Sequence, residues 1–178
     1  MLFRSINFSI NARAEMIGAG VPVIPGSDGE VYTADQALKI AEEIGYPVML
    51  KASAGGGGKG IRKVTAPEDL RPAFESASQE AQAAFGNGAM YLERVVYPAR
   101  HIEVQILADQ HGRVIHLGER DCSLQRNNQK VLEEAPSIAI GQTMRDKIGQ
   151  AAIRAAEAVS YENAGTIEFL LDEEKGEF

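Results

Sequence analysis

Apolar residues recur at helical spacing in three stretches of the chain, which predicts three amphipathic helices. In the first, Thr33 can act as the N-cap with Gln36 as its capping-box partner, and Gly45 ends the pattern. Pro72 is expected to bend the second helix, and Thr143 is expected to cap the third. The predicted inward positions are Ala37, Ile40, Ala41 and Ile44 in the first helix, Leu70, Phe74, Ala77, Ala81 and Ala84 in the second, and Ile148, Ala152, Ala155 and Val159 in the third.

Shorter apolar runs bounded by turn residues predict strands. The expected strands cover residues 48–52, 61–64, 90–96, 101–107, 113–118 and 165–171. Residues 101–107 alternate strictly, so His101, Glu103 and Gln105 share one face, which periodicity alone assigns to solvent. The polar stretch 119–137 has no period and is predicted to be an irregular binding loop. Strands in hairpins with helices between them favour an α+β fold with antiparallel sheets.

Composition narrows the class of function. The chain has 178 residues, with 25 acidic against 18 basic side chains and a net charge of −7, which argues against nucleic acid or an anionic membrane as a partner. Cys122 is the single cysteine among 178 residues, so an internal disulfide is excluded and a Cys/His zinc site is disfavoured. We find neither a signal-peptide pattern nor an apolar run of the ~20 residues that span a bilayer, and we expect a cytoplasmic protein.

The glycine-rich segment 55–60 matches two phosphate-binding patterns poorly. Gly55, Gly57 and Gly60 have the spacing of a dinucleotide fingerprint, but that motif must open a helix and residues 61–64 are predicted to be a strand. A Walker loop is excluded because Ser53 stands where its first glycine is required. A glycine hairpin whose backbone approaches phosphates, or a hairpin tip without a ligand, both remain open.

Two charged residues stand in apolar strands. Lys51 follows Val48–Leu50 and therefore needs an anionic partner or access to solvent, and a nucleotide phosphate is one such partner. Glu168 is flanked by large apolar residues in 166–171, where a carboxylate is costly unless it is paired or binds a metal. A single carboxylate is only part of a Mg²⁺ site.

Several long segments, in order, resemble biotin carboxylase, a member of the ATP-grasp family, most of all the component that serves acetyl-CoA carboxylase. The resemblance covers about residue 10 to the end, and its motifs are GYPVMLKASAGGGGKG (45–60), RHIEVQIL (100–107), ERDCSLQR (119–126), QKVLEEAP (129–136) and GTIEFL (165–170). It implies an ATP-grasp lid domain at 23–94 and a partial central ATP-grasp domain at 95–178, after a tail and linking helix at 1–22.

The resemblance also implies roles for individual residues. Enzymes of this family use ATP with Mg²⁺ or Mn²⁺ to activate bicarbonate as carboxyphosphate, and then carboxylate biotin on its carrier protein, beside a carboxyltransferase. Lys130 corresponds to the lysine that holds bicarbonate and carboxyphosphate, and Glu168 to a nucleotide-site acid that binds the metal. The other nucleotide-binding residues implied are Lys51, Gly57, Gly58, Glu93, Arg94, Val95, Val96, His101 and Asn128.

Departures from the family pattern shape what we expect of this chain alone. Phe8-Ser9 stands where the family carries an Asp-Lys pair, Asn128 stands where many members have histidine, and the chain ends before the second metal-binding acid. We therefore expect a fragment that is inactive by itself; a nucleotide-binding module without turnover and a structural or interaction fragment are the alternatives. The strand 165–171 is expected to form an unpaired sheet edge that favours self-association.

Overall fold

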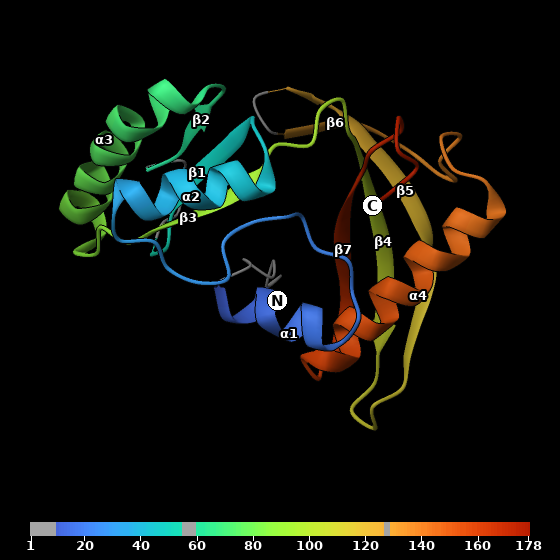
Figure 1. Ribbon diagram of the computed structural model, residues 1–178. Coiled ribbons are helices and arrows are strands. Elements are labelled where there is room, and N and C mark those ends of the chain that lie inside the picture. Colours follow the sequence, from blue (N-terminus) through green and yellow to red (C-terminus); the bar gives the residue numbers. More distant parts are fainter. Residues whose placement is uncertain (1–9, 55–59, 127–128) are drawn as a thin grey trace. The chain divides into compact units, whose positions relative to one another are not determined.

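The computed structural model describes residues 10–54, 60–126 and 129–178 (Figure 1). The described residues divide into two compact units: the first unit is residues 24–95 together with residues 10–11, and the second unit combines residues 12–23 with 96–178. Within the described ranges, no helix has both the length and the apolar character that crossing a membrane requires. The assignment of 23–94 and 95–178 to a lid and a central domain stays a prediction.

The first unit is a three-stranded antiparallel sheet covered on one face by two helices (Figure 1). Its elements are α2 (Ala34–Ile44), β1 (Val48–Ala52), β2 (Arg62–Val64), α3 (Pro67–Phe85) and β3 (Met90–Arg94), with strand order β2-β1-β3. Thr33 and Gln36 form the predicted capping box of α2. The helices bury small residues, among them Ala37, Ala41 and Ala77, against the sheet residues Leu50 and Leu92.

The second unit is built on a four-stranded antiparallel sheet with strand order β6-β5-β4-β7. Its elements are the greater part of α1 (Ile10–Gly18), from residue 12 on, and β4 (Arg100–Ala108), β5 (Val114–Arg126), β6 (Gln129–Glu134), α4 (Gln142–Ala158) and β7 (Asn163–Leu171). One face of the sheet, which we call the helix face, places Ile102, Val104 and Ile106 in one core with Ile148 and Ala152 of α4. We call the other face the polar face.

The mixed helices and antiparallel sheets confirm the α+β prediction, and β7 lies at a sheet edge as expected. After β7, an isolated antiparallel bridge between Asp172 and Glu177 closes a turn. The third helix begins differently from its prediction, because Gly141 rather than Thr143 is the N-cap of α4. Ala84 is exposed rather than inward, and α3 continues through Pro72 as one helix.

The largest correction concerns residues 119–137, which we predicted to be an irregular loop. Much of this stretch is strand, because β5 continues to Arg126 and β6 occupies Gln129–Glu134. All six residues of β6 are exposed. A strand whose two faces are both accessible carries no alternation of apolar and polar residues, so its sequence lacked the pattern on which strand prediction depends.

Candidate functional site

Lys51 of the first unit lies on the sheet face that α2 and α3 leave uncovered. Burial alternates along β1, so Val48, Leu50 and Ala52 face the helices and Lys51 faces away. Its Nζ lies 2.5 Å from Oε2 of Glu93 and 5.7 Å from the ring centroid of Tyr91. The predicted anionic partner of Lys51 is therefore present within the protein itself. The ion pair is only partly buried, with the two side chains 32% and 20% exposed, so Lys51 remains accessible to a ligand.

The segment after Glu93 is held by main-chain hydrogen bonds. The N–H of Arg94 donates to the Pro25 carbonyl and that of Val95 donates to the Pro47 carbonyl, each at 2.8 Å. Gly26 forms an isolated bridge to Glu93, and a Cβ on Gly26 would collide with the Leu92 carbonyl oxygen. Glu93, Arg94 and Val95 thus belong to the first unit, whereas Val96 begins the last segment of the second.

The polar face of the second unit is centred on Glu103, which is only 5% exposed. In the strand register Glu103 lies opposite Arg120 of β5 on one side and Glu168 of β7 on the other. Lys130 of β6 donates to Oε2 of Glu103 and lies 2.6 Å from Oε1 of Glu168, while Arg120 donates to Oε1 of Glu103. Four strands therefore each contribute one charged residue to one network.

Buried carboxylates require this pairing. A charged group removed from water is costly unless cations and hydrogen bonds replace its hydration, and Glu103 receives a cation at each oxygen. Burial acts to lower the pKa of Lys130, but its hydrogen bonds to Glu103 and Glu168 outweigh burial and raise that pKa. Lys130 is therefore held as a fixed positive charge, suited to binding an anion and unsuited to accepting a proton.

The network continues past these four residues. Arg120 also donates to Oε1 of Gln105 at 3.1 Å and lies 3.0 Å from Glu133. Burial acts to lower the pKa of Arg120, but the charge of Glu103, its hydrogen bond to Arg120 and the charge of Glu133 together outweigh burial and raise that pKa. Burial raises the pKa of the nearby Cys122 thiol, which favours the unreactive neutral form.

Possible metal ligands lie at two places on the polar face. Glu103, Cys122 and Glu133 have ligand atoms within 4.8 Å of one another, but the oxygens of Glu103 already accept from Arg120 and Lys130. A protonated thiol also suits a hard cation poorly. Glu168, whose side chain is 52% exposed, fits Mg²⁺ better, since Mg²⁺ is often held by one or two carboxylates together with phosphate oxygens and water.

The structure brings some of the predicted site residues into contact with one another. Lys130 and Glu168 are in contact, and so are Lys51 and Glu93. His101 lies two residues before Glu103 on β4, and its main-chain N–H donates to the hydroxyl of Ser123 at 3.0 Å. Gly57, Gly58 and Asn128 lie outside the described residues.

Sequence reasoning missed Glu103 and Arg120 as site residues. Alternation along residues 101–107 placed Glu103 on a polar face, which periodicity alone assigned to solvent, and the partner strand was expected to end at Gly118. In the structure β5 continues and places Arg120 opposite Glu103. The available signal was the density of charged groups from Arg120 to Lys130, which indicated binding without indicating a partner strand.

Comparison with known proteins adds independent information. Residues 9–178 match the family model described as the ATP binding domain of the carbamoyl-phosphate synthase L chain. The biotin carboxylase of Nostoc sp. is 57% identical over 161 residues, which are 90% of this chain and 36% of that protein. Biotin carboxylase 2 of Bacillus subtilis is 54% identical over 166 residues, which are 93% of this chain and 37% of that protein.

Solved structures agree in fold. A biotin carboxylase-beta-gamma-ATP complex from Campylobacter jejuni matches with a TM-score of 0.84 and 53% identity, over 93% of this chain and 37% of that one. The biotin carboxylase domain of Hydrogenobacter thermophilus 2-oxoglutarate carboxylase, in complex with MgADP, ADP and bicarbonate, matches with a TM-score of 0.83 and 49% identity, over 94% of this chain and 37% of that one. The chain thus spans little more than a third of the length of these relatives.

Proposed function

Since the chain belongs to the family of the carbamoyl-phosphate synthase L chain ATP binding domain, we propose that it supplies part of the MgATP and bicarbonate site of a biotin carboxylase. The parent reaction proposed is ATP-dependent activation of bicarbonate to carboxyphosphate, followed by carboxylation of biotin on a carrier protein. A carboxyltransferase is the further proposed partner, and the cytoplasm the proposed location. The 57% identity to a biotin carboxylase supports this choice within the family.

The observation that carries the proposal is the fixed cation Lys130 beside the exposed carboxylate Glu168 on the polar face. Phosphoryl transfer depends mainly on positioned cations and metal ions. Lys130 would bind bicarbonate and the carboxyphosphate formed from it, because Glu103 holds its ammonium group in place. Glu168 would bind Mg²⁺ together with nucleotide phosphates; the metal would supply charge neutralisation to the transferred phosphoryl group.

In the first unit, Lys51 is the proposed contact to ATP phosphates. Its ion pair with Glu93 is partly exposed, so exchanging the carboxylate for a phosphate oxygen costs little. The segment proposed to contact the adenine is Glu93, Arg94, Val95 and Val96. The contact would be made by main-chain groups beside the N–H groups of Arg94 and Val95, which donate to carbonyl oxygens of the first unit. His101 is the proposed ribose contact, with Gly57, Gly58 and Asn128 as further nucleotide contacts.

Calorimetric titration of MgATP into the chain tests the proposal. We expect binding that weakens about tenfold in Lys51→Ala, the magnitude of one lost charge-assisted contact. Lys39→Ala is the matched control, because Lys39 is exposed on α2, which packs on the other face of the same sheet. No heat at millimolar MgATP, or equal weakening in the two variants, would contradict a nucleotide site at Lys51.

Turnover separates an enzyme from the alternative of a nucleotide-binding module. Release of phosphate from ATP is measured with and without biotin and bicarbonate. Biotin-stimulated release that Lys130→Met abolishes would support the full reaction in this chain. MgATP binding without any stimulated release would instead support binding alone, with the reaction confined to the longer proteins.

A further inference from the structure

The pairing of β5 with β6 contains two compensating irregularities. Between the pairs Asp121–Glu134 and Leu124–Leu132, β5 advances three positions while β6 moves two. Between Leu124–Leu132 and Gln125–Lys130, β5 advances one position while β6 moves two. Each strand therefore contains one extra residue, and the original register is restored at Gln125–Lys130.

Although the register is restored, the side chains that follow the two irregularities lie on the opposite face of the sheet from the one that a regular ladder would give them. Asp121 pairs with Ile102 and lies on the helix face, and in a regular ladder Gln125 and its partner Lys130 would lie on that face too, because side chains alternate with a period of two. Instead Lys130 contacts Glu103 and Glu168 on the polar face. The extra residues invert the alternation in both strands together and so bring Lys130 to the polar face.

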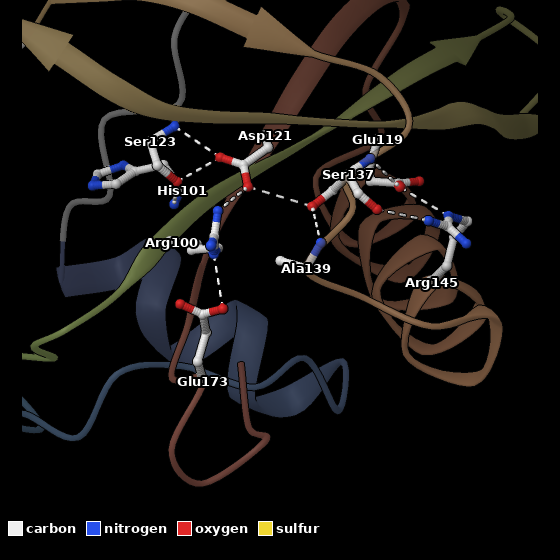
Figure 2. Close-up of polar contacts among 9 residues, drawn as sticks. All are labelled: Arg100, His101, Glu119, Asp121, Ser123, Ser137, Ala139, Arg145 and Glu173. Carbon is white, nitrogen blue, oxygen red and sulfur yellow. Dashed lines mark hydrogen bonds and ion pairs between the residues drawn. The ribbon is translucent and has the colours of Figure 1, made fainter.

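Asp121 holds the extra residue in β5. Its Oδ1 accepts from the main-chain N–H of Ser123 at 3.0 Å and from the Ser123 hydroxyl at 2.5 Å, a local turn that a regular ladder does not contain (Figure 2). The same hydroxyl accepts from the His101 N–H, just beyond the last β4–β5 pair at Ile102–Asp121. Arg100 lies 3.1 Å from Oδ2 and the Ser137 hydroxyl 3.4 Å from it, so the carboxylate of Asp121, a residue only 6% exposed, is held on both oxygens.

We infer that Asp121 is a positioning residue for Lys130: its carboxylate stabilises the bulge in β5 that turns Lys130 from the helix face to the polar face. A regular ladder without the two extra residues is an available alternative, because the pairing before and after the two irregularities has the same register. Removal of the carboxylate therefore releases the bulge and lets the regular ladder compete. The importance of Asp121 for catalysis rests on the proposed function of Lys130. Its role in placing Lys130 on the polar face does not depend on that function.

Lysine acylation followed by mass spectrometry tests the inference in the whole chain without nucleotide. On the polar face the Lys130 ammonium is held between two carboxylates and reacts slowly; a Lys130 released from them regains an ordinary free-amine fraction, which rises tenfold for each unit that a lysine pKa falls. We expect Asp121→Ala to raise the acylation rate of Lys130 by about tenfold, with that of Lys51 in the first unit unchanged.

Glu119→Ala is the matched control. Glu119 is equally buried on the helix face of β5, but it binds the Ser137 N–H and Arg145 of α4 and contacts neither Ser123 nor His101; its one link to Asp121 runs through the Ser137 hydroxyl, which lies 3.4 Å from Asp121 Oδ2 (Figure 2). A general loosening of the second unit would raise the Lys130 rate in both variants, which would overturn the inference. We expect the Lys130 rate to stay within about twofold of the parent in Glu119→Ala.

If Asp121→Ala does not fold, Ser123→Ala is the variant that tests the role of Asp121. It keeps every charge but removes the hydroxyl that joins Asp121 to the His101 N–H, and we expect the Lys130 rate to rise about threefold. An unchanged Lys130 rate in a folded Asp121→Ala, or in Ser123→Ala where the former does not fold, overturns the inference. Because the measurement contains no ATP, its failure would leave the nucleotide proposal standing, and failure of MgATP binding would not alter its result.

Discussion

The two units bury different kinds of side chain. Among the described residues, the first unit buries Ser27 as its one polar side chain, and its core is apolar throughout. The second unit buries three carboxylates, Glu103, Glu119 and Asp121. Each of the three is bound by an arginine, respectively Arg120, Arg145 and Arg100.

The two units therefore hold a functional side chain in place in two different ways. In the first unit an apolar sheet and two helices provide a rigid base, and Lys51 projects from it with a partly exposed partner. In the second unit the charged residues are themselves structural, because Lys130 is held by the same buried carboxylate that Arg120 neutralises. Substitutions at charged residues should therefore affect stability mainly in the second unit.

The largest effect that sharpens this comparison is expected from Leu50→Ala. Leu50 is fully buried at the centre of the first sheet, so its truncation should lower the free energy of unfolding by about 3 kcal/mol. Hydrogen exchange of β1 amides against β4 amides measures the effect in each unit. Ile61→Ala, at an exposed position, should change little, and a comparable loss there would contradict an apolar core as the main source of stability.

Arg120→Met is expected to have the next largest effect. It leaves one oxygen of buried Glu103 without its cation, and we expect a loss of about 2 kcal/mol, confined to β4–β7 amides. Arg154→Met serves as the control, because Arg154 is an exposed arginine of the same unit whose guanidinium donates to the Gly20 carbonyl rather than to a buried carboxylate. Unchanged exchange in β4 after Arg120→Met would remove the distinction between the two units.

Acidic pH should lower the stability of the two units to different extents. Burial acts to raise the pKa of Asp121, but the hydrogen bonds from Ser123 and the pairing with Arg100 outweigh burial and lower it. A lowered folded-state pKa contributes stability that is present above the ordinary value of 3.8 and is lost as the pH falls through the lowered value. We expect β5 amides to lose protection on acidification below about pH 4, and Asp121→Asn to show a flatter dependence.

The smallest stability effect is expected at Lys51. Its ion pair with Glu93 is partly exposed, and such pairs contribute about 0.5 kcal/mol. Lys51→Met should therefore leave the exchange of β1 amides nearly unchanged. A loss as large as that of Arg120→Met would show that the first unit also depends on its charged residues.

The sequence predicted the first unit better than the second. Regular burial along α2, β1 and α3 as far as Ala81 follows from periodicity, and the capping box at Thr33 and Gln36 is a local signal. The second unit depends on cross-strand pairing that no local pattern encodes: exposed β6 has no alternation, and the bulge at Asp121–Leu124 disrupts that of β5. Glu103 could be placed on a polar face, but its burial could not be predicted without Arg120 and Lys130.

Acylation footprinting with and without MgATP tests the central claim, a nucleotide site that includes Lys51, most directly. Each lysine reports separately in one sample, so Lys51 can be compared with Lys39 on the helix side of the same sheet. We predict that saturating MgATP slows the acylation of Lys51 at least about fivefold and leaves Lys39 unchanged, since a bound phosphate both covers the amine and favours its charged form. Equal rates for Lys51 with and without MgATP would contradict the proposed site.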